Sequence, residues 1–203
     1  MSDNKKLGIL LSGRGSNFLA IAHSIDSGKL PGTEIAVVIS NRAEAPGIAA
    51  ARERGLDALV IEANGRKRAE HDAEIIAALR EHQVDLICLT GYMRLLSPQF
   101  VQAFPQRILN IHPSLLPAFP GLDAQRQALE YGVHFSGCTV HFVDEQLDHG
   151  VIVTQRVVPI LPGDDERSLA ARILEQEHQA YPEGIARVLS GRYAIVGRRY
   201  EAR

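Results

Sequence analysis

Short apolar segments recur along the chain, and segments with helical spacing of apolar side chains separate most of them. The apolar segments are short and contain no polar alternation, so they predict strands at residues 7–11, 35–39, 59–61, 86–90 and 108–111. Helices are predicted between them at residues 18–25, 48–54, 70–82 and from Ser97 onward. This alternation is typical of a parallel sheet covered by helices on both faces.

The pattern changes in the last third of the chain. Residues 139–143 and 151–158 are apolar segments with no helix between them, so they predict an antiparallel pair. A long amphipathic helix is predicted over residues 168–181, with Pro182 near its end. Together these patterns predict an α/β, Rossmann-like fold: a mostly parallel sheet with helices on both faces and an antiparallel C-terminal addition.

Composition and charge narrow the classes of function. The chain has 203 residues, of which 45% are hydrophobic and 23% charged, as expected for a globular protein of about one domain. With 22 Lys and Arg against 24 Asp and Glu, the net charge is −2, so no overall field favours nucleic acid or an anionic membrane. We expect the one basic cluster, Arg198, Arg199 and Arg203, to be a solvated tail.

Cysteine usage and hydropathy indicate a compartment. Cys88 and Cys138 are the only cysteines, and both lie in apolar segments, which predicts buried thiols in a reducing environment. The first residues lack the apolar core of a signal peptide, and the longest apolar runs are too short to cross a bilayer. We therefore expect a cytoplasmic protein that binds neither nucleic acid nor membrane.

A glycine-containing loop, residues 12–17, joins the first strand to the first helix. Gly13 and Gly15 allow a tight turn, and the backbone amides of the helix start, with Ser16 and Asn17, suit a phosphate group. A bare strand-to-helix turn is the alternative. The loop lacks the Lys-Ser/Thr pair of a Walker A motif and the third glycine of a dinucleotide fingerprint. We favour phosphate binding over dinucleotide binding.

Asn110 and His112 stand two residues apart at the end of a predicted strand, so their side chains point to the same side. An amide can donate to a developing oxyanion while an imidazole polarises a carbonyl and moves protons, which suits acyl-type chemistry. Asp148, in a later loop, is the candidate to favour the protonated imidazole. A structural histidine at a strand end is the alternative that the spacing leaves open.

No metal is expected. His134, Cys138 and His141 are the nearest approach to a ligand set, but Cys138 and His141 lie an odd number of residues apart on a predicted strand and face opposite sides. His141 faces the same way as Thr139, toward the expected site.

Residues 110–117, Asn-Ile-His-Pro-Ser-Leu-Leu-Pro, resemble the signature of the folate-dependent formyltransferases. Residues 12–17, 91–96, 119–121, 140–143 and 176–178 match the family in the same order. The resemblance covers essentially the whole chain and is strongest to members that formylate glycinamide ribonucleotide. It implies transfer of a formyl group from 10-formyltetrahydrofolate, a cosubstrate, to the amine of that ribonucleotide in purine biosynthesis.

The resemblance also implies residue roles and a single formyltransferase domain over residues 1–203. The N-terminal part, about 1–105, would bind the phosphoribosyl group, and the C-terminal part, about 106–203, would carry the catalytic and much of the folate site. Asn110, His112 and Asp148 would be catalytic, with Asn110 also touching the folate. The remaining roles are substrate binding by Gly15, Ser16, Asn17 and Glu177, and folate binding by Arg68, Met93, Arg94, Leu95 and Leu96.

Two departures from the family pattern affect loops rather than these residues. Asp123 stands where the family commonly has His, and Val151 where it often has Pro. Arg68 is the least well matched position. The resemblance leaves open whether the protein is a monomer or a homodimer.

Other functions compete with this interpretation. A formyltetrahydrofolate deformylase would share the fold, although 203 residues leave no room for its expected regulatory domain. The same length disfavours a methionyl-tRNA formyltransferase, which would need an RNA-binding domain. A non-catalytic phosphosugar-binding module would explain the glycine loop alone. A reductase that binds NADP through Arg42 would lack its third glycine.

Overall fold

The computed structural model describes residues 4–203. The chain separates into two compact units, of which the first ends at Leu109 and the second runs from Asn110 to Arg203. The strand β5, Ile108–His112, spans this division. Its position means that Asn110 and His112 belong to the second unit.

The first unit is built on a parallel sheet in the order β3-β2-β1-β4. Its strands are β1 (Lys5–Leu11), β2 (Thr33–Ser40), β3 (Ala58–Val60) and β4 (Leu86–Leu89). The apolar residues of β1 and β4 and the second half of β2 are buried, whereas those of the edge strand β3 are half-buried. All of these strands were predicted by apolar runs without alternation.

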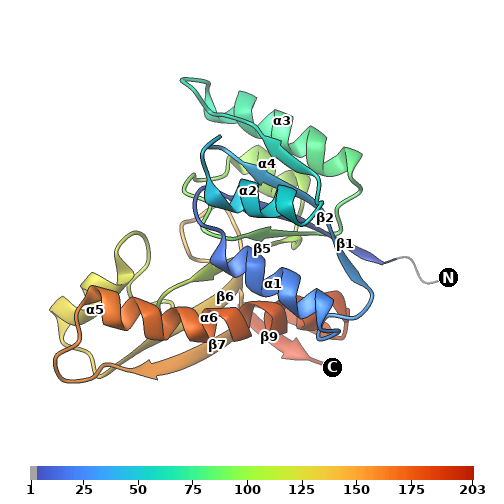
Figure 1. Cartoon of the computed structure of the whole chain (residues 1–203). Coiled ribbons are helices and arrows are strands. Elements are labelled where there is room, and N and C mark those ends of the chain that lie inside the picture. The colour runs from blue at the N-terminus through green and yellow to red at the C-terminus, as the bar shows by residue number, and fades with distance from the viewer. Residues whose placement is uncertain (1–3) are drawn as a thin grey trace. The chain divides into compact units, whose positions relative to one another are not determined.

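Four helices connect these strands: α1 (Ser16–Asp26), α2 (Pro46–Glu53), α3 (Arg68–Glu81) and α4 (Pro98–Ala103). Gly8 and Leu11 point to opposite faces of β1. A side chain at Gly8 would meet Leu79 of α3 at 2.5 Å, whereas Leu11 packs against Gly47 of α2. The helices therefore cover both faces of this sheet (Figure 1).

Local sequence signals set the helix ends in this unit. Gly55 follows α2 with a φ of 70°, the left-handed conformation that ends a helix most easily at glycine. The Ser97 side chain accepts a hydrogen bond from Phe100 N, and Pro98 takes the first position of α4. Both features agree with the predicted helix end at residue 54 and the predicted helix start at Ser97.

The second unit contains the predicted antiparallel pair, β6 (Phe135–Phe142) and β7 (Ile152–Pro159). Helix α6, Glu166–Leu189, packs along both strands (Figure 1). The helix extends well past Pro182, so the prediction that it ends near this proline was wrong. Ile185 and Val188 are buried after the proline, and this packing compensates for the backbone hydrogen bond that proline cannot donate.

The sequence analysis missed three elements of the second unit: helix α5 (Ala124–Tyr131) and strands β8 (Tyr193–Val196) and β9 (Arg199–Ala202). β8 and β9 form an antiparallel hairpin, and β9 pairs with β7 through Ile152 and Arg199. The basic cluster Arg198, Arg199 and Arg203 is therefore not simply a solvated tail. Arg199 lies in β9, and Arg198 bonds to His149.

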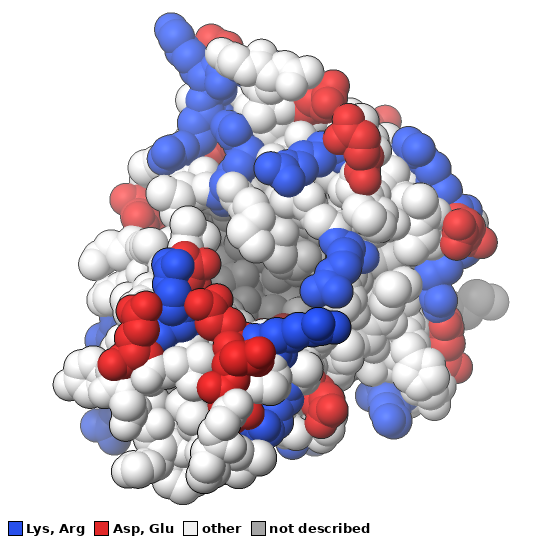
Figure 2. All heavy atoms as spheres, turned by 60° about the vertical axis from the view of Figure 1, so that its left-hand side comes forward, with Lys and Arg blue, Asp and Glu red and all other residues white. Residues whose placement is uncertain are grey.

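The surface carries charged side chains of both signs, and both cysteines lie in the interior. Lys and Arg side chains are interspersed with Asp and Glu on the face drawn in Figure 2. Cys88 and Cys138 are both buried free thiols, as predicted, and burial raises the pKa of Cys138 to about 12. Within residues 4–203, no helix is long and apolar enough to cross a membrane.

Candidate active site

The ends of three neighbouring strands meet at Ser12 in the first unit. The Ser12 hydroxyl donates to Asn41 Oδ1 after β2, at 2.6 Å, and accepts from Met93 N after β4, at 2.8 Å. Ser12 N also donates to Gly91 O at 3.1 Å. The sequence analysis did not assign this role to Ser12. The residue ties the glycine loop to the loop at 91–97 that the resemblance assigns to folate.

The glycine loop leads into α1 with an open helix start. Gly15 adopts a left-handed φ of 70°, and no side chain caps the first turn. Backbone amides at an uncapped helix start have no partner within the helix and carry a partial positive charge. The half-buried Ser16 and the buried Asn17 follow directly. This arrangement has the features that an anion such as phosphate requires.

The loop at 91–97 has an apolar, exposed tip on an anchored base. Met93 is 67% exposed and Leu95 is 53% exposed, while Arg94 and Leu96 are half-buried. At the base, the buried Asp72 carboxylate accepts from Ser97 N at 2.7 Å. Arg68, at the start of α3, is exposed and forms no hydrogen bond or ion pair with this loop within the described chain.

Four polar side chains converge at the end of β5 in the second unit: Asn110, His112, His141 and Asp148. His112 Nδ1 lies 3.4 Å from Asp148 Oδ2, and His141 Nε2 lies 3.8 Å from Asp148 Oδ1. The Asn110 amide nitrogen lies 3.2 Å from His141 Nε2. The structure thus brings the three predicted catalytic residues together and adds His141.

Both nitrogens of the His112 ring face acceptors. Nε2 lies 2.8 Å from Phe119 O, and Nδ1 faces the Asp148 carboxylate. Only a ring that carries a proton on each nitrogen can donate to both partners. His112 is 5% exposed, so few water molecules compete for these positions. To reach a substrate, the ring must release one of these two partners.

His141 orients the amide of Asn110. Its Nδ1 lies 2.8 Å from Phe142 O and is therefore the protonated nitrogen, which leaves Nε2 to accept from Asn110. Burial lowers the pKa of His141, which favours this neutral form. One hydrogen of the Asn110 amide is fixed by His141, and the second remains for another acceptor.

Asp148 is held in an uncommon backbone conformation. Its φ is 47°, in the left-handed region, and its Oδ2 accepts from Gly121 N at 2.8 Å. The loop that carries it ends beside Gly150, where a Cβ would lie 1.8 Å from Phe142 O. Positive φ at non-glycine residues is concentrated at functional sites, because the surrounding structure must enforce it.

One further predicted site residue of the second unit lies on α6, and the two positions that depart from the family pattern lie outside the helices. Glu177 of α6 is buried, and its charge raises the pKa of Cys138. Asp123 precedes α5, where it pairs with Arg126, and its side chain is 54% exposed. Val151 pairs its carbonyl with Phe142 N at 2.9 Å, where the family often has proline.

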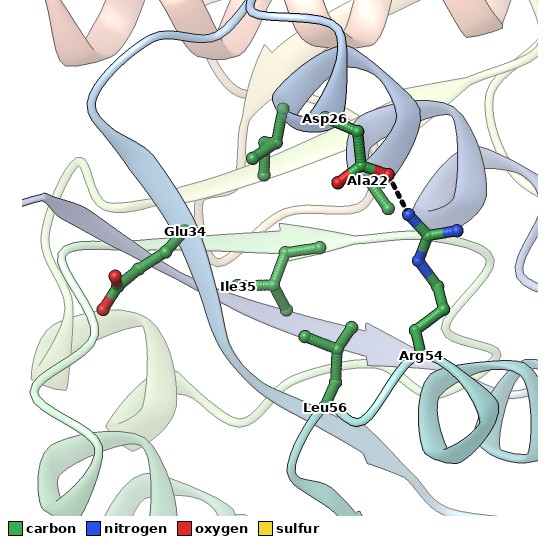
Figure 3. A pocket seen from close by; sticks show the side chains of 7 residues that line it. Ala22, Asp26, Glu34, Ile35, Arg54 and Leu56 are labelled. Carbon is green, nitrogen blue, oxygen red and sulfur yellow. Dashed lines mark hydrogen bonds and ion pairs between the residues drawn. The ribbon is translucent and has the colours of Figure 1, made fainter.

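Two other features bear on ligand binding: the lack of a metal-ligand cluster among residues 4–203, and a cavity in the first unit. No group of three His, Cys, Asp or Glu that could hold a metal ion occurs among residues 4–203. A cavity of about 470 Å³ is lined by α1, β2 and the segment after α2 (Figure 3). Ile35 and Leu56 form part of its wall, and the Asp26–Arg54 ion pair bridges one side. It contains none of the predicted site residues.

Comparisons with known proteins give a consistent family. A family model described as formyl transferase matches residues 5–185. The phosphoribosylglycinamide formyltransferase of Haemophilus influenzae is 44% identical over 94% of this chain and 90% of its own length. The trifunctional purine biosynthetic protein adenosine-3 of Drosophila pseudoobscura is 47% identical over 92% of this chain. The chain spans only 14% of that longer relative.

Solved structures agree with the sequence matches. A glycinamide ribonucleotide transformylase from Symbiobacterium toebii is 49% identical, with a TM-score of 0.96 over 100% of this chain and 95% of that chain. A formyltetrahydrofolate deformylase from Pseudomonas syringae is 25% identical, with a TM-score of 0.90 over 98% of this chain and 66% of its own. The family match, the relatives and the predicted fold agree, and the chain belongs to the formyl transferase family.

Proposed function

We propose that this chain transfers the formyl group of 10-formyltetrahydrofolate to the amine of glycinamide ribonucleotide. The products are formylglycinamide ribonucleotide and tetrahydrofolate. The observation that carries the proposal is the cluster of Asn110, His112 and Asp148 at the end of β5. It occurs in a chain that is 44% identical to a bacterial phosphoribosylglycinamide formyltransferase along nearly its full length.

The cluster has the groups that this reaction needs. The amine nitrogen attacks the formyl carbon, and the carbonyl oxygen becomes an oxyanion. The Asn110 amide keeps one hydrogen for that oxyanion, since His141 fixes the other. One such donor contributes about 100- to 1,000-fold to the rate of acyl transfer. A protonated His112 is a second donor at the same position.

The second half of the reaction is the departure of the folate. The bond between the formyl carbon and N10 of the folate breaks as the oxyanion collapses. A proton moves from the attacking nitrogen to N10, and His112 is the group in the cluster that can carry it. Asp148, whose carboxylate faces Nδ1, stabilises the protonated form of the ring. No covalent intermediate with the protein and no metal are required.

The remaining predicted site residues are assigned to the two substrates, the ribonucleotide and the folate. We assign the ribonucleotide phosphate to the amides of Gly15, Ser16 and Asn17 at the open start of α1. We assign the glycinamide end to Glu177. The folate would contact Met93 and Leu95 on the exposed tip of the 91–97 loop, with Arg94 and Leu96 beside them. Arg68 is the weakest assignment, because it forms no polar contact with that loop within the described residues.

A deformylase is the second candidate, since the Pseudomonas syringae protein has a similar fold. The two functions differ in the acceptor of the formyl group, an amine or water. A spectrophotometric assay of tetrahydrofolate release, with and without glycinamide ribonucleotide, distinguishes them. We expect release only when the ribonucleotide is present. Release at the same rate without it would contradict the proposal and favour the deformylase.

A further inference from the structure

The loop that carries Asp148 is in contact with the C-terminal hairpin. We call residues 143–151, between β6 and β7, the Asp148 loop, and residues 193–202, which contain β8 and β9, the C-terminal hairpin. We propose that Arg198, at the turn of this hairpin, is a positioning residue that holds the Asp148 loop so that Asp148 faces His112. The effect on turnover rests on the proposed function, whereas the effect on the loop does not.

Arg198 holds the residue next to Asp148 in two ways. Its Nη1 lies 2.9 Å from His149 Nε2 and 3.3 Å from His149 Nδ1, in contact with the imidazole ring, and its Nη2 donates to the His149 backbone carbonyl. A single guanidinium group thereby fixes both the side chain and the main chain of His149. The planar fork of arginine suits such a double contact better than a lysine ammonium does.

His149 links Arg198 to the start of the same loop. Its Nδ1 lies 2.8 Å from Asp144 Oδ2, and Asp144 Oδ1 accepts from Gln146 N at 2.9 Å. Because Nδ1 donates to the carboxylate, Nε2 is the ring nitrogen with the free lone pair, and it is the nearer of the two nitrogens to Arg198 Nη1. The series Asp144, His149, Arg198 therefore joins the two ends of the Asp148 loop to the hairpin.

The hairpin is itself attached to both strands that flank the loop. Arg199 of β9 pairs with Ile152, the first residue of β7. Tyr193 of β8 packs against Phe142, the last residue of β6, with ring centroids 6.1 Å apart. Tyr193 also stacks on Tyr200 at 4.8 Å, which stiffens the hairpin. The turn that carries Arg198 is thus fixed relative to the loop it holds.

The middle of the Asp148 loop is exposed to solvent. Glu145, Gln146 and Leu147 are exposed, and they lie directly before Asp148. Asp148 must keep a φ of 47° to face His112. A shift of about 1 Å in a catalytic group can cost on the order of 100-fold in rate. A contact on the neighbouring residue is therefore well placed to control turnover.

The contact between Arg198 and His149 should affect the position of the Asp148 loop more than the free energy of unfolding. Arg198 is exposed and His149 is half-exposed, and ion pairs in such positions contribute little to the free energy of unfolding. We expect Arg198→Ala to keep a thermal midpoint close to that of the unsubstituted protein. Its consequences should appear in the loop and in kcat.

The test compares Arg198→Ala with Arg199→Ala. Both variants remove one exposed arginine from the same hairpin, but within residues 4–203 Arg199 makes backbone pairings alone, with Ile152 and Val196. Hydrogen exchange of the peptide that covers residues 144–150 is measured first. We expect exchange to rise roughly 10-fold in Arg198→Ala and to stay unchanged in Arg199→Ala.

The kinetic measurement uses the same two variants. We expect kcat for formyl transfer to fall about 10-fold in Arg198→Ala, with the KM for glycinamide ribonucleotide within about 2-fold of the unsubstituted value. Arg198→Lys should recover part of kcat, because the ammonium can replace one of the two contacts. Adding His149→Ala to Arg198→Ala should lower kcat by a smaller factor than His149→Ala does in the unsubstituted protein, because the contact that the two side chains share is already lost.

Several results would overturn the proposal. They are unchanged loop exchange in Arg198→Ala, an equal rise in Arg199→Ala, or faster exchange with unchanged kcat. The exchange experiment does not depend on the reaction. If the unsubstituted protein failed to transfer formyl groups, the proposed function would fall, while the exchange data would still decide whether Arg198 holds the loop.

Discussion

At the scale of single residues, two acceptors face the His112 ring. The Asp148 carboxylate faces Nδ1 and Phe119 O faces Nε2. We expect His112→Ala and Asp148→Asn each to lower kcat by at least about 100-fold, because each removes the proton carrier or its stabilising charge. Steady-state kinetics of formyl transfer measures this effect.

Calorimetric titration with glycinamide ribonucleotide provides the control for these variants. The phosphate loop lies in the first unit and is unchanged, so ribonucleotide binding should persist in both. Turnover near the unsubstituted value in either variant would remove that residue from the mechanism. Loss of both turnover and binding would point to a folding defect instead.

His141 should make stability depend on pH. Burial lowers its pKa below the ordinary value of 6.5, so the folded protein binds fewer protons here than the unfolded chain. The stabilisation is complete above that value and declines as the pH falls. His178, whose pKa burial also lowers, contributes with the same sign. The part of the free energy of unfolding that His141 and His178 contribute should therefore fall between about pH 7.5 and pH 5.5, whereas His82, whose pKa is raised by its hydrogen bond to Asp57, contributes with the opposite sign.

The variant His141→Gln tests this prediction, because glutamine does not titrate. Urea unfolding at both pH values should show a smaller loss of stability in the variant than in the unsubstituted protein. His23→Gln, at an exposed position on α1, is the matched control and should retain the original pH dependence. Equal slopes in His141→Gln and the unsubstituted protein would contradict the assignment of His141 as the source.

The candidate site was only partly predictable at this scale. The spacing of Asn110 and His112 placed both on one side of a strand, and an acid was needed nearby. The contact between Asn110 and His141 depends on how β5 and β6 lie side by side, which no local pattern encodes. The role of Ser12 was hidden for the same reason, because its partners follow two other strands.

At the scale of elements, strands of the first unit were predictable because each is a continuous apolar run. Helix α5 was missed because it has only eight residues and starts from Asp123 in a left-handed conformation. The hairpin carried a usable signal, two short strands around Gly197 and Arg198, that was not recognised. Helix α6 continues past Pro182 because tertiary packing overrides the local preference.

Glycines on strands provide a prediction about packing. A Cβ at Gly137 would lie 2.0 Å from Arg156 O, a backbone atom of the paired strand β7, which has no room to move. A Cβ at Gly8 would meet side-chain atoms, the flexible end of Leu79 at 2.5 Å and Val84 at 3.0 Å. We expect Gly137→Ala to lower the free energy of unfolding by about 3 kcal/mol and Gly8→Ala by about 1 kcal/mol.

Urea unfolding measures both values. Gly13→Ala is the control, because its Cβ would meet nothing within 4 Å and its φ is not in the left-handed region. It should change stability by less than about 0.5 kcal/mol. If Gly137→Ala were no more destabilising than Gly8→Ala, the close approach of β6 and β7 at this point would be wrong.

At the scale of the whole molecule, the net charge is small, so the binding of an anion must depend on local groups. A net charge of −2 provides no attraction for an anionic phosphosugar. The attraction must come from the uncapped start of α1 and from Ser16 and Asn17. Such short-range interactions are less sensitive to salt than a broad basic surface is.

Ligand binding to the folded state alone should stabilise the molecule by an amount that grows with the logarithm of the ligand concentration above the dissociation constant. At about 100 times the dissociation constant, glycinamide ribonucleotide should add about 2.7 kcal/mol to the free energy of unfolding, which corresponds to a rise of roughly 5–10 °C in Tm.

His112→Ala should keep this rise in Tm, because it changes the reacting cluster and not the phosphate loop. Gly15→Ala should lose most of it, since Gly15 has a φ of 70° and an added Cβ would meet Gly47 at 3.2 Å. Differential scanning fluorimetry compares the two variants directly. An equal rise in Gly15→Ala would mean that the phosphate is held elsewhere, and loss of the rise in both would mean that binding and catalysis depend on the same residues.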